Sequence, residues 1–213
     1  MNTDELVALL AANGGAVDRA ARGRRIALAA GLGVAGAFVL VAVVIGLRPG
    51  IEADFGVPMF WTRELFCAAL GLSAVSAFVR LGRPGVPVGL SAIGVGLALA
   101  CMWSMAAVTL GLAPPAQRLP LVLGQTWLVC PFLIALVSAP LFAAFFTVLR
   151  ELAPTRLRLA GAAGGFAAGA VGALLYTLHC PELAAPFLAV WYVLGMLIPA
   201  ALGALLGPPL LRW

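Results

Sequence analysis

Long runs of apolar residues alternate with short polar segments along the whole chain. Each of six runs is close to the roughly 20 residues that an α-helix needs to cross the hydrocarbon core of a bilayer. Pro, Gly and Arg residues gather between the runs, where a helix would leave the membrane. The pattern predicts an all-α integral membrane protein, a bundle of six transmembrane helices at residues 26–47, 61–79, 87–110, 132–149, 159–178 and 184–206.

The limits of the fourth span depend on one proline. Residues 121–149 form an apolar run that is too long for one straight crossing, and Pro131 divides it. Because proline interrupts a helix, we expect residues 132–149 to cross. Residues 121–130 are expected to lie near the membrane surface, with Trp127 as an interfacial anchor. The stretch before them is expected to be a proline-rich loop.

The composition agrees with a membrane location and narrows the function. Hydrophobic residues make up 63% of the chain and charged residues 10%, so a soluble domain of this size could not hide its apolar surface. The net charge of +5 comes from 13 arginines, with no lysine. Since the arginines stand at the ends of apolar runs, they indicate membrane topology rather than direct binding of nucleic acid.

The arginines also predict which way the bundle faces. Six spans place both termini on one side, and ten arginines lie on that side against three on the other. The positive-inside rule therefore predicts that both termini are cytoplasmic and that residues 178–182 face outward. The ten are Arg19, Arg22, Arg24, Arg25, Arg80, Arg83, Arg150, Arg156, Arg158 and Arg212, and the three are Arg48, Arg63 and Arg118.

The amino-terminal segment, residues 1–25, is predicted to begin with a short helix capped by Thr3. Acidic residues in its first turn lie near the positive end of the helix dipole. Its leucines form an apolar face that no neighbouring segment covers, so the segment is either a peptide that docks on a partner or a frayed tail. The candidate docking residues are Asp4, Glu5, Leu6, Leu9 and Leu10.

Small residues recur at four-residue spacing in the fifth and sixth spans. Such ridges let helices in lipid approach closely, so they predict tight pairing of these two spans. Pro140 and Pro199 should kink their helices, although proline in a membrane helix commonly serves packing alone. The two ridges are Gly161, Gly165, Gly169 and Ala173 in the fifth span and Gly195, Pro199, Gly203 and Gly207 in the sixth.

Two of the four cysteines share a local sequence. Cys130 and Cys180 each precede a proline at the outer end of a predicted span, so they should lie at similar depth in an oxidising compartment. If the fourth and sixth spans are neighbours, the two thiols can approach disulfide distance. Alternatively they join His179 and Glu182 in holding a soft metal ion. A third possibility, that both are small apolar residues that fill space, stays open.

The remaining polar residues indicate little chemistry. Cys67 and Cys101 are expected to be buried packing residues. Arg63 and Glu64 are expected to pair with each other or to extend to the lipid headgroups. The sequence has no Cys-x-x-Cys, zinc-protease, phosphate-loop or nucleophile-elbow motif and no acid at the middle of a span, so we predict that the protein is not an enzyme and has no resident cofactor.

Several motifs distributed along the chain are specific enough to compare with known families. They are Asn2-Thr3-Asp4-Glu5-Leu6, Phe60-Trp61-x-Arg63, Ala153-Pro154-Thr155, Leu178-His179-Cys180-Pro181-Glu182, Ala185-Pro186-Phe187, Trp191-Tyr192 and Arg212-Trp213. Together they resemble the NrsF family of bacterial inner-membrane anti-sigma factors. The resemblance covers nearly the whole chain, and the His-Cys-Pro-Glu and Trp-Tyr elements are its most specific parts.

The resemblance implies a function. It implies six transmembrane helices and a cytoplasmic amino-terminal segment that sequesters an extracytoplasmic-function sigma factor. It also implies that Cys130 and Cys180 report oxidant or heavy-metal stress, with His179, Pro181 and Glu182 as neighbours of the sensor. A transient heavy-metal ion would have Cys130, Cys180 and His179 as candidate ligands. The alternative is a small membrane transporter or channel whose amino-terminal segment is only a tail.

Overall fold

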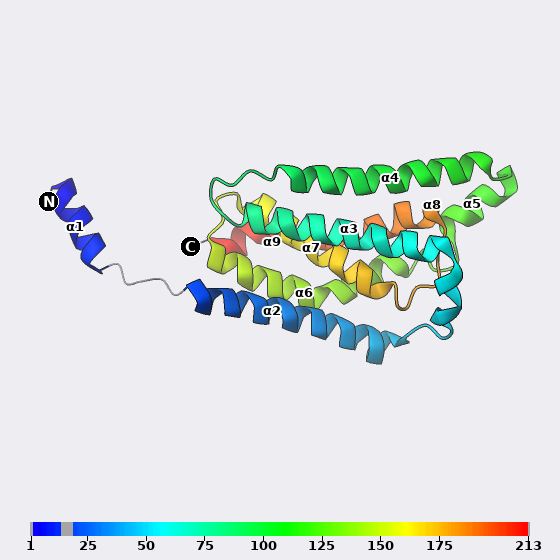
Figure 1. Cartoon of the computed structure of the whole chain (residues 1–213), viewed down its shortest axis with the longest axis horizontal. Helices are drawn as coiled ribbons and strands as arrows, with labels where there is room; N and C mark the ends of the chain where they lie inside the picture. The colour runs from blue at the N-terminus through cyan, green and yellow to red at the C-terminus, as the bar shows by residue number, and fades with distance from the viewer. Residues whose placement is uncertain (1, 14–18, 213) are drawn as a thin grey trace.

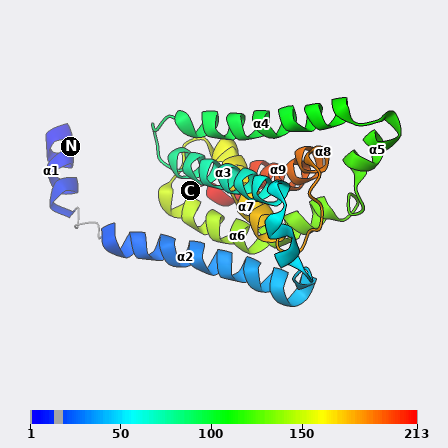
Figure 2. The same ribbon diagram turned by 45° about the vertical axis from the view of Figure 1, so that its right-hand side comes forward.

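A computed structural model describes residues 2–13 and 19–212, and these contain helices and connecting turns but no strand. The long helices lie side by side in a bundle, and the first helix, α1 (Thr3–Asn13), is set apart from it (Figures 1 and 2). The all-helical fold predicted from the hydrophobic pattern is confirmed.

Six helical segments of the described chain are long and apolar enough to cross a membrane. Six helices of membrane-crossing length are thus confirmed, in the predicted order, and their ends differ by a few residues from the predicted spans. The segments are α2 (Arg19–Val39) with the π-helical η1 (Leu40–Gly46), α3 (Pro58–Leu81), α4 (Leu90–Leu112), α6 (Cys130–Leu152), α7 (Leu157–Tyr176), and the continuous α8 (Ala185–Phe187), η3 (Leu188–Tyr192) and α9 (Val193–Leu211).

Two connections contain helices that the sequence did not indicate. The 3₁₀-helix η2 (Ile51–Gly56) precedes α3, and α5 (Pro115–Leu123) stands where a proline-rich loop was expected. Proline is favourable in the first turn of a helix, because that turn needs no intrahelical N–H donor there, so Pro115 starts α5 rather than preventing it.

The last helix is also longer than predicted, since it continues past residue 206 through Pro208 and Pro209. Proline removes a helical N–H and crowds the carbonyl four residues earlier. The last turn is nevertheless held, because Arg150 Nε donates to the carbonyl of Leu210 at 2.9 Å. Gly207 lies directly against the carbonyl of Leu157 at the start of α7.

Helix α7 is the most enclosed of the six and packs closely on α9, as the small-residue ridges predict. A Cβ added to Gly161 would collide with the carbonyl of Gly203, and one added to Gly165 would collide with that of Pro199. Gly195 departs from the predicted ridge, because it faces Ile134 of α6 instead. Close backbone contact therefore joins α7 and α9 over most of their length.

The proline inside α6 has a packing role. A Cβ on Gly36 of α2 would lie 3.2 Å from the Cβ of Pro140, and one on Gly33 would lie 3.3 Å from the Cα of Leu141. Helix α2 thus packs on α6 through two glycines that leave room for the proline ring.

Most of the arginines and the thiol pair lie at opposite ends of the bundle. Helix α2 begins, α9 ends, and the α3–α4 and α6–α7 connections turn at one end, which we call the arginine end (Figure 1). The other end, which we call the thiol end, has the η1–α3, α5–α6 and α7–α8 connections. The arginines expected on the amino-terminal side lie at the arginine end, whereas Cys130 and Cys180 lie at the thiol end.

Candidate thiol site

The segment after α7, residues 177–182, is short and carries Cys180; we call it the thiol loop. Its first turn is closed by backbone bonds from His179 and Cys180 to the carbonyl of Tyr176, at 2.9 and 3.1 Å. Pro181 has no N–H and cannot extend this turn into a helix. Cys180 is therefore held just beyond the end of α7, with no exposed surface.

Cys130 reaches the same place from another element. It is the first residue of α6, and its N–H donates to the carbonyl of Thr126 at 2.8 Å. Its side chain is fully buried and forms a hydrogen bond with Cys180. Both are free thiols. The structure thus brings together the two cysteines that share the Cys-Pro sequence.

Two tyrosines enclose the thiol pair. Tyr176 hydrogen-bonds to both thiols, and its ring centroid lies 6.1 Å from that of Tyr192. The Tyr192 hydroxyl is fully buried close to Cys180 and has no hydrogen-bond partner among the described residues. No sequence pattern predicted these contacts, although Tyr192 belongs to the Trp-Tyr element.

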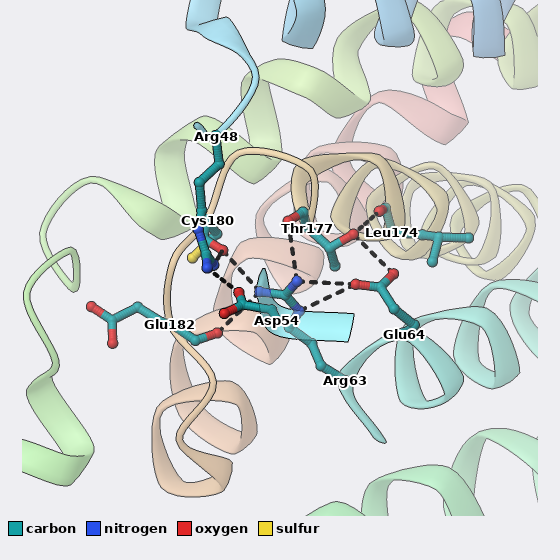
Figure 3. Close-up of polar contacts among 8 residues, drawn as sticks. All are labelled: Arg48, Asp54, Arg63, Glu64, Leu174, Thr177, Cys180 and Glu182. Carbon is teal, nitrogen blue, oxygen red and sulfur yellow. Dashed lines mark hydrogen bonds and ion pairs between the residues drawn. The ribbon is translucent and has the colours of Figure 1, made fainter. Parts of the chain in front are cut away.

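Arg63 is the largest polar side chain at the site and has no exposed surface. Its Nη1 donates to the carbonyls of Cys180 (2.8 Å) and Glu182 (3.2 Å), and its Nη2 donates to that of Thr177 (3.2 Å; Figure 3). Nε and Nη2 both donate to Glu64 Oε1, at 3.3 and 3.1 Å. The expected pairing with Glu64 is confirmed.

The expectation that Arg63 extends to the headgroups is wrong. The guanidinium points inward because the thiol loop folds over α3 and presents three carbonyls that need donors. Full hydrogen bonding and one carboxylate offset the cost of burying the charge.

Glu64 completes this arrangement from the same turn of α3. Its second oxygen, Oε2, accepts from the Thr177 hydroxyl at 2.9 Å, so the carboxylate ties Arg63 to the start of the thiol loop (Figure 3).

The other two cysteines differ from each other. Cys67 is buried as predicted, on α3, close enough to Cys180 for electrostatic interaction. Cys101 is exposed on α4, so its predicted burial is wrong. The reason is that α4 lies at the outside of the bundle, with most of its surface uncovered.

The thiol loop also contacts the end of the first long helix. Arg48 follows η1, and its N–H donates to the carbonyl of Leu178 at 3.0 Å, while its Nη1 donates to that of Cys180 at 3.4 Å. His179 Nδ1 lies 2.8 Å from the carbonyl of Gly46. Arg48 is itself paired with Asp54. The loop is thus bonded to the segment that leads back through α2.

His179 and Glu182 turn away from the thiols. Glu182 Oε1 accepts from the N–H of Gln125 at 2.6 Å and from the hydroxyl of Thr126 at 3.4 Å. In the described ranges, no group of three or more His, Cys, Asp and Glu side chains is arranged to hold a metal ion. With the loop in this conformation, a soft metal ion would meet the Cys130 and Cys180 thiols without His179 or Glu182.

The surroundings make Cys180 the more acidic thiol of the pair. The Cys130 thiol donates to its sulfur, which lowers the pKa of Cys180 below the usual thiol value, although burial acts in the opposite direction. The Tyr192 hydroxyl, the N–H of Glu182 and the charge of Arg63 lower this pKa further. Since the thiolate is the nucleophile, Cys180 is the group that would attack first, and Cys130 is the group that would pair with it.

The predicted docking helix is present as α1, with Asp4 and Glu5 in its first turn. The side chains of Leu6 and Leu9 are exposed. The side chain of Leu10 lies outside the described residues, so nothing is added to its predicted role.

Six helices of membrane-crossing length, with a buried thiol pair at one end, are compatible with a multi-pass membrane protein. A family described as negative regulator of sigma F, NrsF, matches residues 10–213. The chain belongs to this family of anti-sigma factors, which confirms the resemblance found in the sequence.

Two relatives match over the full length of both chains. One is described as a probable anti-sigma-F factor NrsF from Azospira oryzae and is 47% identical over 213 residues. The other is described as the anti-sigma-F factor NrsF from Caulobacter vibrioides and is 38% identical over 215 residues. No solved structure matches the chain.

Proposed function

We propose that this protein is a multi-pass protein of the bacterial inner membrane that holds an extracytoplasmic-function sigma factor inactive. Reaction of Cys130 and Cys180 with an oxidant or a heavy-metal ion on the outer side then releases the sigma factor. Membership of the anti-sigma family supports the partner. The observation that carries the proposed trigger is the contact between two buried free thiols, one at the start of α6 and one in the thiol loop.

The proposed orientation rests on the distribution of arginines, and the proposed docking segment rests on the exposed leucines of α1. The arginine end is the cytoplasmic end by the positive-inside rule, and α1 precedes the helix that begins there. Exposed leucines beside two acids suit a helix that lays its apolar face on a partner. Asp4, Glu5, Leu6, Leu9 and Leu10 are the residues proposed to bind the sigma factor.

The thiol chemistry balances with a peroxide as the oxidant. The Cys180 thiolate attacks one peroxide oxygen, hydroxide leaves, and a sulfenic acid remains on Cys180. The Cys130 sulfur then attacks the Cys180 sulfur and its proton leaves with the hydroxyl as water, so a disulfide forms. A soft divalent ion would instead displace the protons of both thiols and bridge the sulfurs.

The bonds of the thiol loop offer a route to the docking segment. A disulfide draws two sulfurs from hydrogen-bond contact to about 2.05 Å, which shifts the Cys180 backbone against Arg48 and the end of η1. Because η1 continues α2, the change can reach the segment next to α1. Moving the partner from almost fully bound to almost fully free needs an affinity difference on the order of 10⁴-fold.

The test is the stress response of cysteine variants in cells. Cys130→Ser and Cys180→Ser should hold a sigma-dependent reporter at its unstressed level after oxidant or heavy-metal treatment, at unchanged protein abundance. Cys101→Ser is the matched control and should respond like the wild type. Cys101 lies on the uncovered surface of α4, half-way along that helix and not at the thiol end. A normal response in both of the first two variants would refute the proposal.

The transporter or channel alternative gains little support. The described residues with buried polar or charged side chains are Arg63, Ser91, Ser138 and Thr177. A hydrophilic path along the bundle would need more such residues.

A further inference from the structure

Resting on the proposed thiol function, we propose that Arg63 is the positioning residue of the site. Its guanidinium fixes the backbone of the thiol loop so that the Cys180 sulfur stays against Cys130 in a reactive geometry. Arg63 touches no reacting atom in this role; it acts through the loop.

The hydrogen bonds show how complete this hold is. A guanidinium carries five N–H donors, and the five bonds of Arg63 use two on Glu64 and three on the loop carbonyls. The three carbonyls span the loop from Thr177 to Glu182 and include that of Cys180 itself. Arg63 therefore supplies donors that a regular helix or sheet would otherwise provide, and Arg48 adds a longer bond to the Cys180 carbonyl at 3.4 Å.

The bonds of Arg63 lie next to the Cys180 thiol. The backbone N–H of Glu182 lies close enough to Cys180 to stabilise its thiolate, while the carbonyl of Glu182 accepts from Arg63 at 3.2 Å. Arg63 thus holds the Cys180 carbonyl directly, and it holds the neighbouring Glu182 backbone that faces the Cys180 sulfur. Disulfide formation requires the Cβ atoms to come within about 3.5–4.5 Å, so a loop free to drift would react slowly.

In this chain a lysine would reproduce the role of Arg63 only in part. Its ammonium has three donors on a flexible stem, whereas the carbonyls and the carboxylate surround a flat, five-donor group. A lysine would keep the positive charge near Cys180 but leave buried carbonyls without partners. Arg63→Lys therefore separates the loop geometry from the charge, and Arg63→Gln removes both.

The experiment uses the full chain, purified in lipid nanodiscs, with diamide as the oxidant. Diamide takes two electrons and two protons from the thiol pair and is reduced to a hydrazine, and mass spectrometry quantifies the Cys130–Cys180 disulfide. Arg63→Lys and Arg63→Gln should form the disulfide at least tenfold more slowly than the wild type. Arg118→Lys is the matched control and should react normally, because Arg118 is exposed and bonds only locally, to the carbonyl of Ala113.

A second readout distinguishes positioning from a general structural role. The rate of Cys180 alkylation by iodoacetamide is measured against pH. In Arg63→Gln the midpoint for Cys180 should move to higher pH, and in the control Arg118→Lys it should not. Arg63→Lys should move it less, since the charge remains.

Each outcome decides the question. If folded Arg63→Lys and Arg63→Gln proteins oxidise at the wild-type rate, the positioning role is wrong. If either variant does not fold, Glu64→Gln and Thr177→Val loosen the same hold while Arg63 remains, and about threefold slower oxidation is expected; wild-type rates in both would equally overturn the inference. A wild-type protein that forms no Cys130–Cys180 disulfide would instead count against the oxidative part of the proposed function.

Discussion

Arg63 and Arg118 are the same residue type near the same end of the bundle, yet their surroundings differ completely. Arg118 is exposed and donates to a carbonyl five residues earlier. Arg63 has no exposed surface and bonds a loop that lies more than a hundred residues later in the chain. A count of arginines treats the two alike, because it considers only on which side of a span each arginine stands.

The hydrogen bond between the two thiols leads to a prediction at this scale. Cys130→Ala removes the donor that lowers the pKa of Cys180, so this pKa should rise and the thiolate fraction at neutral pH should fall. The pH midpoint of Cys180 alkylation should therefore move upward in Cys130→Ala. Cys130→Ser, whose hydroxyl can still donate, should move it less. Identical midpoints in the wild type and Cys130→Ala would contradict the assigned bond.

Only part of the site could be predicted from the sequence: the meeting of the two cysteines, but not the contacts of the polar residues around them. Cys130 and Cys180 share a proline and a place at the end of a span, so their meeting was foreseeable. The inward turn of Arg63 was not, because it depends on carbonyls of a loop whose fold no local pattern specifies. His179 and Glu182 stand beside Cys180 in sequence, but their side chains bond to Gly46 and to the α5–α6 turn instead.

At the scale of the elements, the α7–α9 seam is the closest helix contact. Gly165→Ala places a Cβ against the carbonyl of Pro199 and should destabilise the protein by about 1–3 kcal/mol. Gly96→Ala is the matched control, because nothing lies within 4 Å of its added Cβ on α4. Thermal unfolding in one detergent should show a lower midpoint for Gly165→Ala and an unchanged or slightly higher one for Gly96→Ala. Equal midpoints would mean that the seam tolerates extra volume.

A second prediction at this scale concerns α1. Leu6→Asp with Leu9→Asp puts two charges on the face proposed to dock, so co-purification with the sigma factor should be lost. Ala8→Asp adds the same charge about 200° around the helix axis from Leu6 and should leave binding intact. If the double variant still co-purifies at the wild-type level, α1 is a tail and not the docking element.

The secondary structure was more predictable than the site, for a physical reason. Membrane-length apolar runs leave a chain few options other than helices, so all six segments follow from hydropathy. Their ends follow less well, because they depend on particular bonds. Helix α9 continues through Pro208 and Pro209, and Arg150 donates to the carbonyl of Leu210 there. Helix α5 begins at Pro115, in a segment whose prolines predict a loop.

At the scale of the whole molecule, the thiol end and the arginine end belong to one bundle and are connected through its helices. The thiol loop is bonded to η1 and α3, and η1 continues α2 towards the arginine end, where α1 precedes it (Figure 1). In the proposed mechanism a change at Cys180 acts on η1 and, through it, on the helix nearest the docking segment. The charge asymmetry gives the two ends different compartments in the proposed orientation.

The most direct measurement is sigma-factor affinity before and after thiol oxidation, on the full-length protein in nanodiscs. Complete formation of the Cys130–Cys180 disulfide by diamide should weaken binding at least tenfold, and reduction should restore it. A Cys130→Ser protein given the same treatment should keep its affinity. An affinity that stays the same after the wild-type disulfide has fully formed would contradict the central claim.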